Sequence, residues 1–135
     1  MRVLFDTNVI LDFLLDRKPF DDDSFDAVKK TIFNGDKAYI SSNSITDIYY
    51  LIHREYKKKE NCLKSIKSLF NIFHIAEVNE KSIELAISSK LKDFEDAVLD
   101  SVGYQLQVDY IITRNKNDFK DSLNMIVNPT EFLKL

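Results

Sequence analysis

The sequence places four aspartates where they could do chemistry: Asp6, Asp47, Asp96 and Asp118. Each lies on a separate segment, at or near a transition between a strand-like apolar run and a helix. Carboxylates that are brought together repel one another, and such crowding is tolerable mainly around a hard divalent cation, which prefers oxygen ligands. If the fold gathers these segments, the four acids predict a divalent-metal site.

Asp6 carries the strongest single signal. It lies between the apolar runs 3–5 and 9–11, where burial of its carboxylate is expensive unless a cation or a hydrogen-bond donor meets it. Asp47 and Asp96 also have a structural interpretation, because residues 44–47 and 93–96 resemble capping boxes at helix starts. The predicted convergence of all four segments, rather than any one residue, favours a shared chemical role.

No other catalytic set is present in the sequence. It has no Gly-x-Gly-x-x-Gly or Walker-type loop. The lone Cys62 has no partner for a zinc site or a disulfide, and we interpret it as a small core side chain. His53 and His74 fall in apolar-periodic segments, which favours structural or surface roles for both.

Charge gives a weak indication of partners. The net charge of −3 argues against a surface that is basic throughout, because nonspecific nucleic-acid binding depends on neutralising phosphates. Positive charge is nevertheless concentrated in one segment, which contains Lys57, Lys58 and Lys59. Such a run is most often a solvated helix face, but these lysines could guide a phosphate backbone.

The elements that must position the acids alternate along the chain. Short apolar runs predict strands at Val3–Phe5, Ala38–Ile40, Phe73–Val78, Tyr110–Ile112 and Met125–Val127. Helical periodicity predicts helices over 9–15, 21–33, 44–56, 63–73, 83–91 and 93–106, and a short one from Pro129. This alternation predicts an α/β fold, a three-layer α/β/α sandwich with a mainly parallel, about five-stranded sheet.

In such sheets ligands bind outside the carboxyl ends of the strands, where Asp6 and the segment 113–118 lie. A length of 135 residues predicts one domain over residues 1–135, long enough to bury a core without disulfides. The single cysteine and the lack of any run of about 18 apolar residues predict a reducing, cytoplasmic setting without a membrane span.

The segments that carry these acids resemble the motifs of PIN-domain nucleases, a family that includes VapC-like toxins. Residues 6–12, Asp-Thr-Asn-Val-Ile-Leu-Asp, look like the family's opening motif. Residues 93–97 resemble its third acidic motif, and residues 112–119 resemble its closing strand-loop motif. Each block is weak alone, but their order and approximate spacing extend the resemblance across nearly the whole chain.

The resemblance implies a ribonuclease that hydrolyses RNA with Mg²⁺ or Mn²⁺. It implies that Asp6 and Asp96 are direct metal ligands, with Asp118 completing or supporting the set. Asp47 would be the second acid, where the family more often has glutamate, so the shorter side chain would act through water. Asn115 is a second departure, since many relatives carry aspartate there, and this leaves open whether Asn115 or Asp118 approaches the metal.

The resemblance also implies supporting groups and partners. Thr7, Asn8 and Thr113, with Asn115, would orient the carboxylates or the attacking water. A VapC-like toxin would have a small antitoxin protein that blocks the acidic site, and it would form a homodimer.

Three other readings of the sequence are weaker. A phosphatase of the haloacid-dehalogenase type would need an acid in place of Asn8. A receiver-like domain would need an acid pair before the first helix and a phosphoacceptor on the third strand. A PIN fold that has lost catalysis, and serves as an RNA-binding or protein-interaction module, is the alternative that the departures at Asp47 and Asn115 keep open.

Overall fold

A five-stranded parallel sheet forms the centre of the computed structural model, which describes residues 1–135. Its strands, in chain order, are β1 (Arg2–Phe5), β2 (Lys37–Ser41), β3 (His74–Ala76), β4 (Tyr110–Ile112) and β5 (Ile126–Val127). Their order in space is β3-β2-β1-β4-β5, and every neighbouring pair is parallel. The predicted fold class is therefore confirmed.

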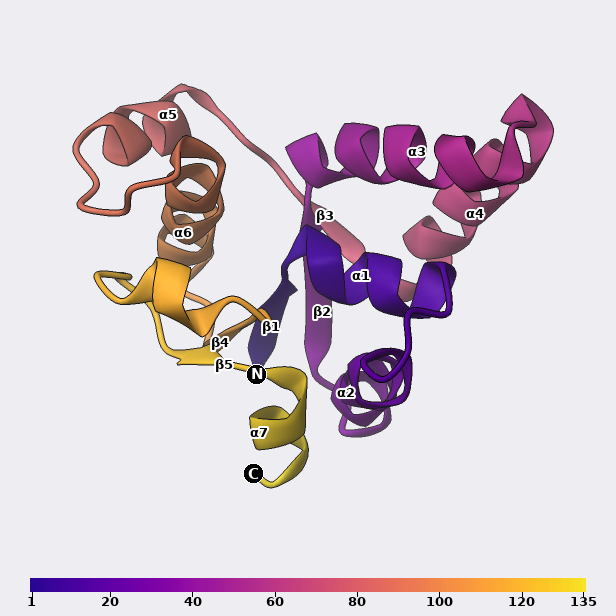
Figure 1. Cartoon of the computed structure of the whole chain (residues 1–135). Coiled ribbons are helices and arrows are strands. Elements are labelled where there is room, and N and C mark those ends of the chain that lie inside the picture. The colour runs from indigo at the N-terminus through magenta and orange to yellow at the C-terminus, as the bar shows by residue number, and fades with distance from the viewer.

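Helices cover both faces of this sheet (Figure 1). In chain order they are α1 (Thr7–Leu14), α2 (Asp21–Phe33), α3 (Ser42–Tyr56), α4 (Lys59–Ile72), α5 (Glu80–Ile87), α6 (Phe94–Leu106), the 3-10 helix η1 (Lys116–Phe119) and α7 (Pro129–Leu133). Helices α1 to α4 and α7 share one apolar core with the sheet, while α5 and α6 share the other. None of the helices combines the length and the hydrophobicity that a membrane span requires.

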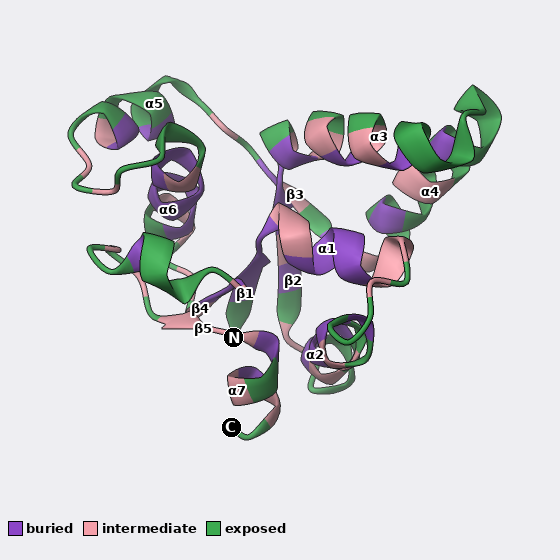
Figure 2. Ribbon diagram, viewed as in Figure 1, coloured by how far each residue is buried: buried purple, intermediate pink, exposed green.

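The central strand β1 explains the two cores. Val3 and Phe5 belong to the first core and Leu4 to the second, and all three side chains are 0% exposed. Successive side chains of a strand point to opposite faces, so an all-apolar strand requires cover on both sides. Figure 2 shows this burial along the strands and on the sheet-facing sides of the helices. Cys62 lies in the first core, as predicted.

Three local predictions were wrong. Helix α5, predicted over 83–91, spans Glu80–Ile87. Helix α3 begins at Ser42 with Ser41 as its N-cap, so Ser44 lies inside the first turn and forms no capping box with Asp47. The break before α4 is only Lys57–Lys58 rather than 57–61, because Lys57 adopts a left-handed conformation (φ 54°) that ends α3 within one residue. By contrast, Asp93 is the N-cap of α6, and its carboxylate accepts a hydrogen bond from the Asp96 N–H.

The order of the strands fixes where a site should lie. Beyond β1 the chain first adds β2 and β3 on one side and later adds β4 and β5 on the other, so the direction of winding reverses between β1 and β4. Parallel sheets bind ligands at this reversal, outside the carboxyl ends of the strands. Asp6 follows β1 and Thr113 follows β4, so both lie at the expected point.

Candidate active site

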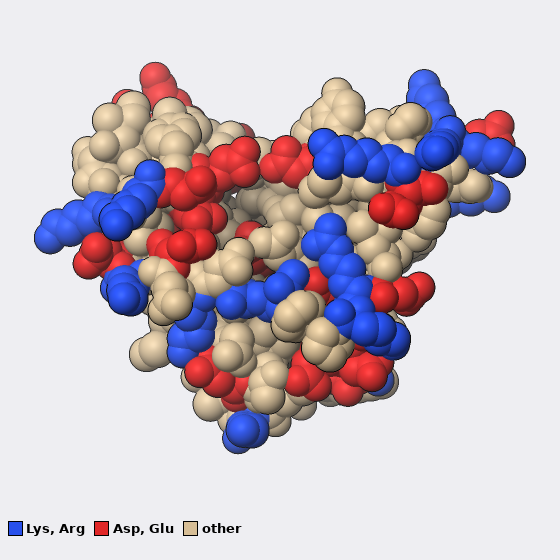
Figure 3. Space-filling view, viewed as in Figure 1, with Lys and Arg blue, Asp and Glu red and all other residues tan.

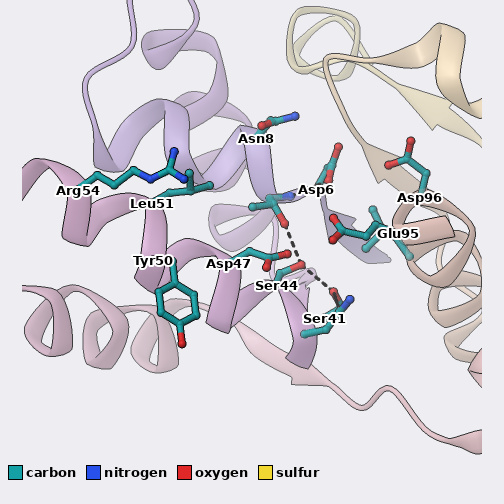
Figure 4. A pocket seen from close by; sticks show the side chains of 13 residues that line it. Asp6, Asn8, Ser41, Ser44, Asp47, Tyr50, Leu51, Arg54, Glu95 and Asp96 are labelled. Atoms are coloured by element: carbon teal, nitrogen blue, oxygen red, sulfur yellow. Dashed lines mark hydrogen bonds between the residues drawn. The ribbon is translucent and has the colours of Figure 1, made fainter. Parts of the chain in front are cut away.

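A pocket of about 360 Å³ opens at the carboxyl edge of the sheet, between α3 and α6. Four of its lining residues are acids: Asp6, Asp47, Glu95 and Asp96. Figure 3 shows the hollow with acidic side chains around it, and Figure 4 shows their carboxyl groups directed into one space from three separate segments. The fold thus gathers three of the four aspartates that the sequence singles out.

Asp6 lies at the base of the pocket and is only 9% exposed. Its Oδ1 accepts a hydrogen bond from the Thr7 N–H (2.8 Å), and its Oδ2 accepts one from the Thr113 hydroxyl (2.7 Å). The Thr113 hydroxyl in turn accepts a hydrogen bond from the Asn115 N–H (3.1 Å). Burial raises the pKa of Asp6, and these neutral donors offset the effect only in part.

Asp96 and Glu95 form the opposite wall, in the first turn of α6. Burial, followed by the charges of nearby carboxylates, raises the pKa of Asp96 to about 7. The charge of Asp47 and then burial raise the pKa of Glu95. The acids of the pocket therefore lie close enough for their charges to act on one another, in addition to the effect of burial.

Glu95 is the acid of the pocket that sequence reasoning missed. It belongs to the acidic stretch 93–96, of which only Asp96 was assigned a chemical role. The available signal was its place in the first turn of a predicted helix, next to Asp96. Which of two adjacent acids faces a pocket depends on how the helix is rotated, and here both do.

Asp47 reaches the pocket from α3, and three hydroxyl groups tie the start of that helix to α1. The Thr7 hydroxyl donates a hydrogen bond to the Ser44 hydroxyl (2.9 Å), and the hydroxyls of Ser44 and Ser41 are 2.8 Å apart. Ser41 and Ser44 are buried, so this network holds α3 against α1. Asp47 is thereby held across the pocket from Glu95, whose pKa its charge raises.

Asp118 and the three lysines for which the sequence suggested substrate binding lie outside the lining of this pocket. Asp118 is exposed on η1 and lines an adjoining pocket of about 240 Å³ together with Asp93. It is nevertheless a near neighbour, because its charge raises the pKa of both Asp6 and Asp96. Lys57, Lys58 and Lys59 are exposed where α3 meets α4.

The remaining supporting residues fall close to the carboxylates. Asn8 lines the pocket, at the start of α1. Thr7 and Thr113 both contact Asp6, as described above, whereas Asn115 is exposed and reaches the network only through its backbone N–H. Arg54, from the last turns of α3, is the only lysine or arginine that lines the pocket.

The donor set fits a hard divalent cation with water among its ligands. As the side chains are placed, no three His, Cys, Asp or Glu residues converge closely enough to hold an ion by themselves. Mg²⁺ usually keeps several waters and binds proteins through one or two carboxylates. Asp6 and Asp96 provide two such oxygen donors in one pocket. Burial is the main reason why the pKa of each is raised, and the charges of neighbouring carboxylates add to the effect at Asp96.

Comparison with known proteins agrees with this architecture. The sequence profile of the PIN domain matches residues 2–117. This chain belongs to the PIN-domain family. Ribonuclease VapC1 of Aquifex aeolicus (strain VF5) is 30% identical to it over 131 residues, which cover 93% of this chain and 89% of that protein.

Solved structures share the PIN fold. VapBC2 from Rickettsia felis, bound to a promoter DNA fragment, matches with a TM-score of 0.77 at 15% identity, covering 95% of this chain and 98% of that one. A toxin-antitoxin complex from Klebsiella pneumoniae matches with a TM-score of 0.67 at 20% identity, covering 94% and 97%. Within this PIN fold the three sequence motifs lie after β1, at the start of α6 and at the end of β4, so all three adjoin the acidic pocket or its neighbour.

Proposed function

We propose that this chain is an endoribonuclease that depends on Mg²⁺ or Mn²⁺ and hydrolyses RNA phosphodiester bonds at the acidic pocket. The observation that carries the proposal is the meeting of Asp6 and Asp96, from the end of β1 and the start of α6, in one pocket where no cation pairs with either. The similarity to Ribonuclease VapC1 over nearly the whole chain supports RNA as the substrate.

In this proposal Asp6 and Asp96 hold the divalent ion, and Asp118 and Asp47 act through its bound waters. The ion, when bound, supplies a water of lowered pKa and stabilises charge on the phosphoryl oxygens. Thr113 and the Thr7 N–H hold both oxygens of Asp6 in place through the hydrogen bonds described above. Glu95 and Asp47 face each other across the pocket and can accept hydrogen bonds from water there.

The first test is RNA cleavage by the purified protein in Mn²⁺. Asp6→Asn and Asp96→Asn should each lower the rate of cleavage at least about a hundredfold, because a lost metal ligand removes several kcal/mol of transition-state stabilisation. Asp22→Asn is the matched control, since Asp22 is exposed on α2, outside the pocket. Full activity in both site variants would refute the assignment.

Calorimetry with Mn²⁺ separates the nuclease from a PIN-fold module that has lost catalysis. The nuclease must bind Mn²⁺, and Asp6→Asn must weaken that binding. Wild-type protein that binds RNA without binding Mn²⁺ and without cutting the RNA would instead favour the module. Asp47 and Asn115, where the chain departs from the usual family pattern, are the residues that such a result would implicate.

The same proposal includes protein partners. The match to the Klebsiella pneumoniae toxin-antitoxin complex supports a role as the toxin of such a pair, with a small antitoxin that blocks the acidic pocket. We also propose a homodimer. Co-expression with the product of a neighbouring short gene, followed by size-exclusion chromatography with light scattering, tests both: a stable complex and a two-copy mass are expected.

A further inference from the structure

Asp100 is a buried carboxylate to which the proposed function gives no role. It lies on α6 and is 2% exposed, and no lysine or arginine forms an ion pair with it. Burial of a carboxylate is costly unless hydrogen-bond donors meet its oxygens. The donors that meet Asp100 therefore show which part of the chain this residue holds.

All of these donors come from one short stretch, residues 122–124. The Ser122 hydroxyl and the Asn124 side-chain amide (2.7 Å) donate hydrogen bonds to Oδ1 of Asp100. The Leu123 N–H donates one to Oδ2 (3.0 Å), and the Asn124 amide also donates to the Asp100 carbonyl oxygen (2.8 Å). The stretch is tied to itself as well, because the Ser122 hydroxyl accepts a hydrogen bond from the Asn124 N–H (2.9 Å). We call Asp100 together with residues 122–124 the Asp100 clamp.

A glycine on α6 leaves room for the Asp100 clamp. Gly103 lies three residues after Asp100, on the same side of the helix. A Cβ atom at position 103 would lie 3.2 Å from Asn124 Nδ2 and 3.0 Å from Cδ1 of Ile111, closer than ordinary van der Waals contact. Glycine is a poor helix former. The close approach of Asn124 and of β4 explains why the helix nevertheless has one here.

The clamped residues end the crossover that joins β4 to β5, residues 113–125. Adjacent parallel strands need a long crossover, which is usually an α-helix. This crossover contains only the short 3-10 helix η1, so it depends on anchors outside itself. Thr113 anchors its start to Asp6, and Phe119 anchors η1 in the second core. The Asp100 clamp anchors its end.

The clamp connects two acids of the proposed metal site. Asp96 lies on α6, four residues before Asp100, so the two side chains share a face of the helix. Asp118 lies on η1, four residues before the clamped Ser122. It lines a pocket together with Asp93, whose carboxylate accepts a hydrogen bond from the Asp96 N–H (3.0 Å). Helix α6 thus carries one acid of the site and holds the segment that carries another.

We infer that Asp100 is a positioning residue, which ties the end of the β4–β5 crossover to α6 and so keeps Asp118 beside Asp96. This inference rests on the proposed function and deepens it. Asp100 lies outside the lining of the acidic pocket, so it acts only through Asp118. A clamp that served the fold alone would stabilise the protein without changing how the folded protein binds metal. The affinity for metal therefore separates the two roles.

The test measures Mn²⁺ affinity by titration calorimetry, well below the melting temperature of every variant. Asp100→Asn keeps the size of the side chain but turns an amide N–H₂ group toward the donors of residues 122–124, which should release the crossover. We expect the affinity to fall about fivefold, against about tenfold for Asp118→Asn, which removes the positioned acid itself. In protein that already carries Asp118→Asn, the Asp100→Asn change should alter the affinity less than about twofold.

A milder variant and a matched control complete the design. Asn124→Ala removes both hydrogen bonds of the Asn124 amide, and we expect a loss of Mn²⁺ affinity of about threefold. Val28→Ala removes apolar contacts in the first core, on α2 and outside the acidic pocket, so it should lower stability and leave Mn²⁺ affinity unchanged. Hydrogen exchange in EDTA gives a readout without metal: amides of residues 116–124 should exchange faster in Asp100→Asn and Asn124→Ala than in the wild type.

Two results would overturn the inference: Mn²⁺ affinity in Asp100→Asn equal to that of Val28→Ala, or the same loss with and without the Asp118 carboxylate. If Asp100→Asn does not fold, Asn124→Ala is judged by the same two criteria. If the wild type binds Mn²⁺ and cuts RNA while the clamp variants bind Mn²⁺ normally, the inference is wrong and the proposed function stands. If the wild type binds no Mn²⁺ and cuts no RNA, the proposed function fails and the inference fails with it.

Discussion

Asp6 is the N-cap of α1 and Asp12 lies in its second half. Both are buried, at 9% and 0% exposed, but their surroundings differ. Asp12 accepts hydrogen bonds from Arg114 Nε (2.8 Å) and Nη2 (3.0 Å), and a third from the Ser24 hydroxyl (2.9 Å). Asp6 accepts hydrogen bonds only from a hydroxyl and a backbone N–H. One buried carboxylate is thus paired with a cation. The other forms no ion pair, and the charge of Arg114 lowers its pKa by less than burial raises it.

The comparison teaches that burial alone does not identify a functional acid in this molecule. A carboxylate with a bidentate arginine has a complete set of partners and serves the structure. The two sites are nonetheless connected, because Arg114 follows Thr113 in the chain. The ion pair with Asp12 anchors the same loop whose Thr113 hydroxyl holds Asp6. The guanidinium of Arg114 also lies over the Phe20 ring, 4.0 Å from its centre, which further fixes the loop.

The largest effect should come from breaking the ion pair between Asp12 and Arg114. Asp12→Asn leaves Arg114 without its anion, and we expect the free energy of unfolding to fall by about 3 kcal/mol. This value is at the low end for a buried pair, because the Arg114 side chain is 24% exposed. Urea denaturation in EDTA measures it, with the exposed Asp22→Asn as control. A loss below about 1 kcal/mol would show that the pair is not structural.

The pocket that contains Asp6 and Asp96 should bind metal in a strongly pH-dependent way. Asp96, with a pKa of about 7, must lose its proton before it can hold a cation. Its deprotonated fraction falls about 30-fold between pH 8 and pH 5.5, and we expect the affinity for Mn²⁺ to fall about as much. Titration calorimetry at several pH values measures this. An affinity that stays constant down to pH 5.5 would contradict the role of Asp96.

Removal of the Thr113 hydroxyl should have a smaller effect. Thr113→Val keeps the shape of the side chain but removes the hydrogen bond to Asp6, and it leaves the Asn115 N–H without its acceptor. We expect Mn²⁺ affinity to fall about tenfold, as is usual for a group that orients a metal ligand. Thr46→Val, at an exposed position of α3, is the control. Equal affinities in the two variants would remove Thr113 from the site.

The smallest effect should be a gain in stability. Because the folded protein keeps the Asp96 proton up to about pH 7 and the unfolded chain loses it near pH 4, metal-free stability falls as pH rises between these values. Asp96→Asn removes this loss, and we expect a gain of about 1 kcal/mol at pH 8, discounted for partial exposure. Urea denaturation at pH 8 and pH 4.5 measures it, with no gain expected at pH 4.5. A destabilised variant at pH 8 would mean that a partner stabilises the charged Asp96 carboxylate, as Arg114 stabilises that of Asp12.

The sequence by itself determined the order of the elements, the parallel sheet and the family. The order of the elements and the parallel sheet follow from local patterns, namely the apolar runs of the strands and the helical spacing between them. The family follows from the resemblance of residues 6–12, 93–97 and 112–119 to its motifs. The position of Asp6 between two apolar runs already implied that its burial needed a reason. These patterns involve residues that are close together in the sequence, so they can be recognised without knowledge of tertiary contacts.

Only the tertiary structure decided which groups share the pocket. The sequence suggested that Ser44 caps α3, whereas in the structure its hydroxyl accepts a hydrogen bond from Thr7. The difference depends on the residue at which α3 begins after β2. Glu95 lines the acidic pocket, whereas Asp118 lines the adjoining one. The packing of α6 and of the loop after β4 determines which pocket each side chain enters. Packing sets the distances between segments that are remote in the sequence, and the periodicity of one segment does not predict them.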